Sequence, residues 1–458
     1  MKKMWLTALG LFAVLSGYAQ AQDEVAIKKI FDTELTQGKV YSLLEYLTTS
    51  IGPRLSGSPG AAAGVEWGRH AMEMEGLDSV WLQPVMVPHW VRGQKEIARI
   101  INSKKMGTVD VNVCALGGSI GTGPSGVVGN VIEVTSFDDL KRLGTKNITG
   151  KLVFFNRPMD PTFIHTFHAY GAAVDQRVQG ASQAAKYGAT GVIVRSMSLG
   201  NEDYPHTGSV VYDTTVTKIP AVAISTKHAD LLSKLLKEDK GVQFYIETHS
   251  EILDDVPSFN VVGEIKGSEY ADEIILVGGH LDSWDLAQGA QDDGAGCVQS
   301  LEVLRLLNTI GYKPKRTIRA VLFMNEENGL RGALEYARLA GLKKEKHIAA
   351  IESDDGGFTP RGFSMEATPD IRTKVKSWAN LLEPYGLTEF NGEGGGADVG
   401  PLKPQGATIF EFLPDSQRYF RYHHTKEDTF DKVDKRELEL GAASMTALVY
   451  LIDRYGLK

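Results

Sequence analysis

The chain has 458 residues, with 49 basic and 57 acidic side chains and a formal net charge of −8. Hydrophobic residues make up 42% of it, which excludes a disordered, collagenous or coiled-coil chain. The acidic balance argues against a nucleic-acid partner, because neutralising phosphates requires basic surfaces. Cys114 and Cys297 lie far apart in unlike contexts, so we expect both to be unpaired and the core, rather than a disulfide, to hold the fold.

The first 21 residues are typical of a secretory signal peptide. Lys2 and Lys3 precede an apolar run that is too short to cross a membrane, and the small residues Ala19 and Ala21 suit a cleavage site. We therefore expect residues 1–21 to be removed and the mature protein to be secreted or periplasmic. No membrane attachment is expected after cleavage.

Hydrophobic spacing before residue 117 predicts three helices followed by two strands. The helices fall within residues 23–51, on either side of Gly38, and at 61–74, and the strands at 79–83 and 97–101. Pro84 and Pro88 cannot donate to a strand ladder, so the stretch between the two strands belongs to a sheet edge or a loop.

Short strands alternate with helices from about residue 117 to residue 248, which predicts a separate small α/β domain. Four segments of it resemble the protease-associated domain: residues 150–154, 184–189, 191–194 and 219–222. This resemblance implies a non-catalytic domain, 117–248, inserted into a catalytic domain made of residues 22–116 and 249–458.

The last segment, from about residue 250, alternates regularly between strands and helices. Strands are predicted at 273–277, 316–324, 347–351 and 408–413, and helices at 297–307, 330–339, 371–382 and 435–455. The expected fold class is therefore α/β: a three-layer α/β/α catalytic domain with a mixed, mostly parallel sheet, plus the smaller inserted α/β domain.

Acidic and imidazole side chains directly follow three of these strands. His280 follows the first, Glu326 and Glu327 the second, and Asp354 the third. Sites in open α/β sheets form beyond the carboxyl ends of the strands. Oxygen and nitrogen ligands without thiolates suit zinc, so the pattern predicts a metal site at this edge.

Two loops and one neighbouring acid complete the candidate set. Asp292 lies in a loop-to-helix turn, and His424 precedes the final helix. Asp282 shares a face of an extended segment with His280, where its carboxylate could orient the imidazole. If one carboxylate bridges, five ligands can hold two ions, and one acid of the Glu326-Glu327 pair remains to move a proton.

Each of these residues taken alone has a commoner structural explanation, such as a turn, a helix start or a solvated surface. His423, next to His424, is ambiguous by itself, and the other histidines lack such a context. The order of the whole set along the strand ends makes the metal site the stronger interpretation.

The set resembles the zinc aminopeptidase family with paired metal ions. The motifs that carry the resemblance are residues 278–284, 289–294, 325–327, 352–354 and 424–425. Two further runs, residues 51–58 and 87–93, narrow it to a carboxypeptidase branch of that family. The resemblance covers essentially the whole mature chain.

The resemblance implies a role for each matched position. His280 and Asp354 would bind one zinc, Glu327 and His424 the second, and Asp292 would bridge the two ions. Glu326 would be the general base and Asp282 the orienter of His280. The resemblance also implies a homodimer and a cis peptide bond between Asp292 and Asp293.

The leading interpretation is a secreted exopeptidase with two zinc ions per chain that cleaves dipeptides and short peptides. An aminopeptidase acting on longer peptides, a one-zinc glutaminyl cyclase and a non-hydrolytic peptide-binding protein are the alternatives. The full ligand set argues against the cyclase, and the presence of Glu326 argues against the binding protein.

Residues 394–398 have two interpretations of equal weight: a substrate-pocket loop, from the resemblance, or a flexible surface loop. Side-chain preference and the end of the substrate that is released stay open, and no cationic group for a substrate carboxylate is identified.

Overall fold

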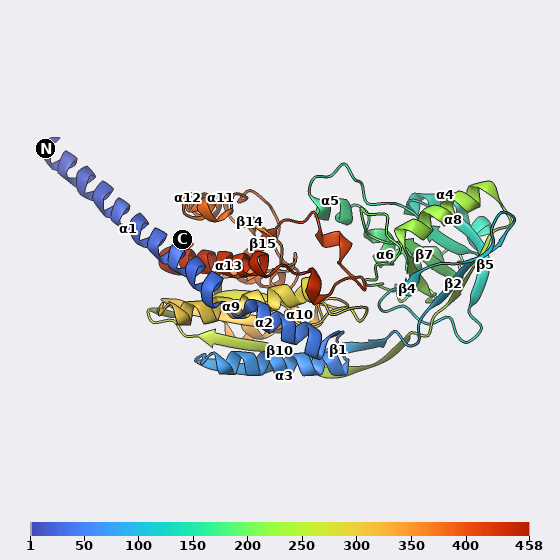
Figure 1. Ribbon diagram of the computed structural model, residues 1–458, viewed down its shortest axis with the longest axis horizontal. Helices are drawn as coiled ribbons and strands as arrows, with labels where there is room; N and C mark the ends of the chain where they lie inside the picture. Colours follow the sequence, from blue (N-terminus) through green and yellow to red (C-terminus); the bar gives the residue numbers. More distant parts are fainter. Residues whose placement is uncertain (1, 458) are drawn as a thin grey trace.

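Two β-sheets organise the computed structural model, which describes residues 2–457 and the side chains from residue 20 onward (Figure 1). The first sheet has seven strands in the order β1-β10-β12-β11-β13-β15-β14. These are β1 (Ser79–Val91), β10 (Glu251–Ile265), β12 (Arg316–Phe323), β11 (Tyr270–His280), β13 (Lys346–Glu352), β15 (Thr408–Pro414) and β14 (Pro360–Glu366). The four central strands are parallel and the outer ones antiparallel, so the predicted α/β fold with a mixed sheet is confirmed.

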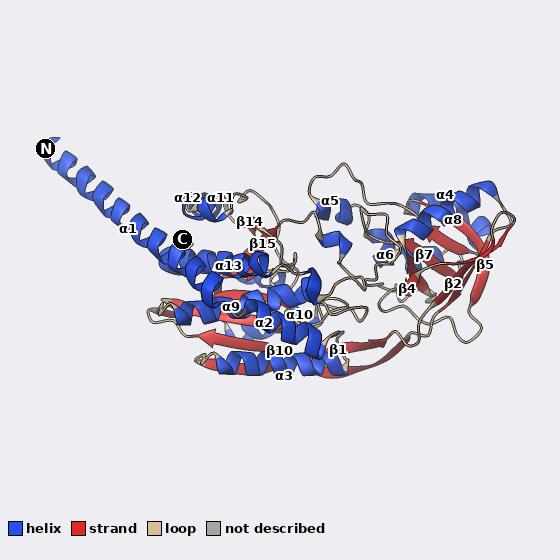
Figure 2. Ribbon diagram, in the orientation of Figure 1, coloured by secondary structure: helices blue, strands red, loops and turns tan. Residues whose placement is uncertain are grey.

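Helices cover both faces of this sheet (Figure 2). Side chains alternate along β11, so that Ile275 and Val277 join one core and Leu276 the other. The helices against the first face are α1 (Lys2–Gln37), α2 (Val40–Glu45), α3 (Pro59–Met74), α9 (Ala295–Thr309), α11 (Pro369–Lys376), α12 (Ala379–Leu382) and α13 (Lys435–Tyr455). The opposite face is covered by α10 (Arg331–Lys343) and the short helix η4 (Gly400–Gln405).

Several elements of the first sheet differ from the sequence-based expectation. Strand β1 continues through both prolines, because it is an edge strand with a register shift between Val87 and His89. Strand β10 was not expected, since its first half is exposed and acidic, and β14 was not expected because it contains Pro360 and Gly362. The predicted helix 371–382 is divided into α11 and α12.

The helix α1 runs without interruption from Lys2 to Gln37, and its first turns project away from the body (Figure 1). The side chains of residues 1–19 lie outside the described part, so cleavage after residue 21 stays a prediction. Within residues 2–457, no helix combines the length and the apolar character needed to cross a membrane.

The second sheet has eight strands in the order β3-β2-β9-β5-β6-β7-β8-β4. They are β2 (Ile97–Ser103), β3 (Gly107–Asp110), β4 (Val113–Ala115), β5 (Val127–Val134), β6 (Leu152–Phe155), β7 (Gly191–Arg195), β8 (Ala221–Ile224) and β9 (Gln243–Glu247). Its helices are α4 (Phe137–Ile148), α5 (Thr166–Gly171), α6 (Asp175–Val178), α7 (Gly180–Ala185) and α8 (Thr226–Glu238). The long ribbon of β1 and β10 connects the two sheets.

Strands β2, β3 and β4 pair within the second sheet, so this sheet includes residues that precede residue 117. Strand β2 pairs with β9, more than 140 positions later in the sequence, and such a partner cannot be recognised from local spacing. We call residues 97–247 the inserted unit. None of its strands belongs to the first sheet.

A buried carboxyl group on α1 makes stability depend on pH. Burial, followed by the hydrogen bond and charge of Glu302, raises the pKa of Glu34 from 4.5 to about 10. Arg305 lies 3.5 Å from Glu34 but pairs more closely with Glu302, and both Glu34 oxygens lack a hydrogen-bond donor. Because the folded state holds this proton more tightly than the unfolded chain, the free energy of unfolding should fall as pH rises through this range.

Glu34→Gln should remove that loss and raise the melting temperature at pH 8, by about 1 °C for each kcal/mol recovered in a chain of 458 residues. Glu24→Gln, an exposed change on the same helix, is the matched control. Thermal unfolding of the three proteins between pH 5 and pH 9 checks this. Parallel pH profiles for wild type and Glu34→Gln would contradict it.

Candidate metal centre

Three adjacent parallel strands deliver the predicted site residues to one edge of the first sheet. His280 is the last residue of β11, which pairs with β12 on one side and β13 on the other. Glu326 and Glu327 follow β12, and Asp354 follows β13. Since all three strands run in the same direction, their carboxyl ends meet, as sites in such sheets require.

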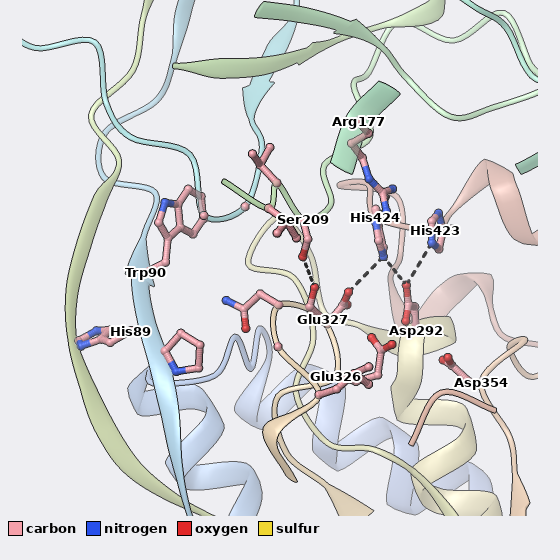
Figure 3. A pocket seen from close by; sticks show the side chains of 18 of the residues that line it. His89, Trp90, Arg177, Ser209, Asp292, Glu326, Glu327, Asp354, His423 and His424 are labelled. Atoms are coloured by element: carbon pink, nitrogen blue, oxygen red, sulfur yellow. Dashed lines mark hydrogen bonds and ion pairs between the residues drawn. The ribbon is translucent and has the colours of Figure 1, made fainter. Parts of the chain in front are cut away.

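Two histidines and three carboxylates converge at this edge, and Figure 3 shows Asp292, Glu327, Asp354 and His424 among them. His280 Nε2 lies 3.2 Å from Asp292 Oδ1 and 3.1 Å from Asp354 Oδ1. His424 Nε2 lies 3.3 Å from Asp292 Oδ2 and 3.1 Å from Glu327 Oε2. Asp292 therefore directs one oxygen toward each imidazole, and the five residues form two sets that share this carboxylate.

The chemistry of these donors fits divalent cations. Burial raises the pKa of Glu327 and of Asp354, and neighbouring carboxylates including Asp292 raise both further. Glu327 Oε1 is buried without a hydrogen-bond partner in the described chain. Such acids are stable as carboxylates only beside positive charge. Imidazole and carboxylate donors without a thiolate are those of a catalytic zinc site.

His423 is a second candidate at the same place. Its ring stacks on that of His424 with centroids 3.6 Å apart, and Asp292, His423 and His424 form a group that could also hold an ion. However, His423 Nε2 lies 3.9 Å from Asp292 Oδ2, farther than either contact of His424. Glu327 therefore completes the second set more closely than His423 does.

Asp282 differs from its predicted role. The ring nitrogen Nδ1 of His280 lies 2.9 Å from the main-chain oxygen of Asp282 and 4.0 Å from its carboxylate. The carboxylate instead accepts hydrogen bonds from the main-chain N–H groups of Asn325, at 2.6 Å, and Glu326, at 3.0 Å. Asp282 thus orients His280 through its backbone and holds the Glu326 segment through its side chain.

Glu326 lines the cavity beside the two sets but forms no ion pair within the described chain (Figure 3). Burial raises its pKa to about 8, and the charges of Asp354 and Glu327 contribute to the increase. An acid that is close to the ligands but not engaged by the histidines is placed to accept and return a proton.

The turn that carries Asp292 is held by two residues whose importance was not recognised in the sequence. The carboxylate of Asp428 accepts hydrogen bonds from the N–H groups of Ala290, Gln291 and Asp292. Arg54, fully buried, donates to the main-chain oxygens of Gln288 and Gly289. The peptide bond between Asp292 and Asp293 is cis, so that expectation is confirmed.

A cavity of about 550 Å³ opens beside the centre and is lined by both parts of the chain. The inserted unit contributes Phe167, Tyr170, Arg177, Ser209, Val210 and Val211 to its wall. Arg177 is a residue that the sequence reasoning missed, because nothing in its local pattern distinguishes it from a helical surface arginine. Its side chain points toward His424 (Figure 3).

Residues 394–398 are neither a free surface loop nor part of this cavity as described. The N–H groups of Asp398 and Val399 donate to Glu352 Oε2 at 2.9 and 2.8 Å, and Asp398 is buried. Gly396 lies so close to the Glu352 carboxylate that a β-carbon would overlap it. The loop is therefore fastened to the end of β13.

The fold and these donors define a class of α/β enzymes that act through metal ions at the carboxyl edge of a sheet. Residues 260–449 match the model of peptidase family M28. The chain is 35% identical over 418 residues to carboxypeptidase Q of Bos taurus, covering 91% of this chain and 85% of that protein. The chain belongs to peptidase family M28 and is a metallopeptidase.

Solved structures agree with this assignment. A peptidase M28 precursor from Shewanella amazonensis SB2B has a TM-score of 0.89 and 34% identity, covering 94% of this chain and 97% of that one. A zinc aminopeptidase from Bacillus subtilis, with a TM-score of 0.64 and 20% identity over 90% of this chain and 94% of its own, shares the fold.

Proposed function

We propose that this metallopeptidase is an exopeptidase that holds two zinc ions and cleaves dipeptides and short peptides with free ends. His280 and Asp354 would hold one ion, Glu327 and His424 the other, and Asp292 would bridge them. When bound, the two ions would activate water and polarise the scissile carbonyl. Glu326 would take the proton of the attacking water and deliver it to the leaving amine.

Arg177 is the observation that carries the preference for a free carboxylate. It is only 6% exposed, yet within residues 2–457 it forms no ion pair with a carboxylate. Its guanidinium donates to Tyr170 Oη at 2.7 Å and to the Thr207 main-chain oxygen at 3.5 Å, while Nε has no partner. A buried cation without an anion at a cavity wall is suited to bind the carboxylate of a ligand.

The other end of a short peptide is recognised by negative charge. Glu326 and Asp354 both line the cavity, and the side chain of Asp354 is 23% exposed. These acids attract a substrate ammonium group, whereas Arg177 attracts a carboxylate. A dipeptide carries an ammonium group and a carboxylate close together. One molecule can therefore pair with the acids and with Arg177 at the same time.

The inserted unit would restrict access to thin chains, because its residues form one wall of the cavity. We assign it as a protease-associated domain, residues 97–247, on the motifs that resemble such domains. We also infer a cleaved signal peptide, residues 1–21, a secreted or periplasmic mature protein, and a homodimer. The word precursor in the name of the Shewanella protein supports the signal peptide.

The test is a matched panel: a free dipeptide, its N-acetylated form, its C-terminally amidated form and a long unstructured protein. Arg177→Met should lower kcat/KM for the free dipeptide by about 10- to 100-fold, the value of a charge-assisted hydrogen bond, and change the amidated form little. Arg195→Met, an arginine of the inserted unit already paired with Asp230, is the control.

Three results would contradict the proposal in different ways. Equal wild-type rates on the amidated and free dipeptides would remove the carboxylate requirement and favour an aminopeptidase on longer peptides. Equal rates on the acetylated and free forms would remove the ammonium requirement. Internal cuts in the long protein would exclude an exopeptidase.

A further inference from the structure

A short segment of the inserted unit contacts both loops that carry the second set of candidate ligands. This segment, residues 206–209, is here called the clamp. It lies between the second sheet and the His424 loop, and His206 and Thr207 are buried. The contacts were not foreseeable from sequence, because His206 and His424 are more than 200 positions apart.

The clamp holds the main chain on both sides of the His424 side chain. His206 Nδ1 lies 2.9 Å from the main-chain oxygen of His423, and the Thr207 N–H donates to the main-chain oxygen of His424 at 2.9 Å. His424 Nδ1 lies 3.3 Å from the Thr207 oxygen. Arg177 Nη1 lies 3.4 Å from the same ring nitrogen, so both neighbours of Nδ1 belong to the inserted unit, while Nε2 faces Asp292 and Glu327.

The same clamp also reaches Glu327. The hydroxyl of Ser209 donates to the main-chain oxygen of Glu327 (Figure 3). Both non-bridging members of one ligand set, Glu327 and His424, are therefore attached to the inserted unit. For His280, the contacts of the imidazole and main chain are with other residues of the catalytic part, Asp282 and Asp293 among them.

The backbone conformation of His424 requires contacts of this kind. His424 has a φ of 62°, in the left-handed region that a residue with a β-carbon rarely adopts. Such a conformation persists only where surrounding contacts fix it. Two of the contacts that fix it come from His206 and Thr207.

The clamp is itself anchored to the inserted unit. The His206 N–H donates to Ser196 Oγ at 2.8 Å, and that hydroxyl donates to the main-chain oxygen of Ile224 at the end of β8. His206 Nε2 lies 2.8 Å from Glu202 Oε2. The ring of His206 thus has a hydrogen-bonding partner at each nitrogen. Through it, the backbone of His423 and His424 is held at a fixed place relative to the second sheet.

We propose that the clamp fixes the geometry of one of the two metal sites, the one formed by Glu327 and His424. It leaves the site formed by His280 and Asp354 unaffected. The inference rests on the proposed two-zinc centre. His206 and Ser209 act as positioning residues, through the backbone of the ligand loops. The inserted unit is then part of the metal site and does more than shape the cavity.

Three variants of one residue separate the contacts. In His206→Asn the side-chain amide reaches the place of Nδ1 and keeps the donor to His423. In His206→Gln it reaches the place of Nε2 and keeps only the contact with Glu202, and His206→Ala loses both. Ser209→Ala removes the Glu327 contact by an independent and smaller change. Thr166→Val, which removes a hydrogen bond from the inserted unit to Ser416, is the matched control.

The measurement is the stoichiometry and affinity of zinc, by titration of the metal-free full-length enzyme against a chromogenic chelator. Wild type, Thr166→Val and His206→Asn should bind two ions alike. His206→Ala, His206→Gln and Ser209→Ala should keep one ion at wild-type affinity and bind the other about 10- to 100-fold more weakly.

Unchanged affinities in the alanine variants, or equal weakening of both ions, would overturn the clamp. Circular dichroism and cooperative unfolding confirm that each variant is folded, and Ser209→Ala carries the test if His206→Ala does not fold. The wild-type stoichiometry tests the two-zinc centre and the difference between variant and wild type tests the clamp, so the two failures are distinguishable.

Discussion

Glu326→Gln should lower kcat by about 10²- to 10⁴-fold, the usual contribution of a general base, while the enzyme keeps its fold and its bound zinc. Glutamine has nearly the same size and fills the same place, but it cannot accept a proton from water. The main-chain contact that holds this residue, from its N–H group to Asp282, does not involve the side chain and is retained.

The neighbouring residue provides the matched control. Glu327→Gln makes the same chemical change one position later, where the carboxylate lies 3.1 Å from His424 Nε2. Glu327→Gln should lower both the zinc content and kcat, whereas Glu326→Gln should lower kcat alone. Steady-state kinetics and zinc content of both variants give the answer, and activity of Glu326→Gln within a few-fold of wild type would exclude Glu326 as the base.

The parts of the fold that could be predicted are those that depend on local pattern. The buried strands β11, β12 and β13 and the long helix α13 are continuous or periodic hydrophobic segments, and their positions follow from the sequence alone. Because these strands are parallel neighbours, the residues that follow them also had to meet.

The parts that could not be predicted depend on contacts between distant segments. Strand β2 looks like any short strand, and only its pairing with β9 assigns it to the second sheet. Arg177 and His206 lie in helical and loop sequence without a motif, and each matters because the fold brings it to His424. The carboxylate of Asp282 was expected beside His280, but backbone geometry gives that contact to its carbonyl.

These distant contacts bring the inserted unit to the cavity beside the metal centre. The β1-β10 ribbon crosses between the sheets, and residues from both sheets then meet at the cavity. Gly208 illustrates the closeness of the fit, since a β-carbon there would lie 2.4 Å from the guanidinium carbon of Arg177. Its φ of 128° also lies in a region that favours glycine.

Removing one ligand at a time should reveal the shared carboxylate. His424→Ala should leave one zinc ion per chain, because His280 still contacts both Asp292 and Asp354. Asp292→Ala should leave neither ion tightly bound, since this carboxylate faces both imidazoles. Both variants should lose essentially all turnover, as each disrupts the proposed two-ion centre.

His423→Ala is the control that makes this result decisive. His423 stacks on His424 and lies 3.9 Å from Asp292, so it is a neighbouring imidazole that could replace Glu327 as a ligand. If Glu327 and His424 hold the second ion, His423→Ala should retain two zinc ions in the purified enzyme. Loss of one ion from His423→Ala, with full occupancy in Glu327→Gln, would reverse the assignment, because His423 would then hold the ion in place of Glu327.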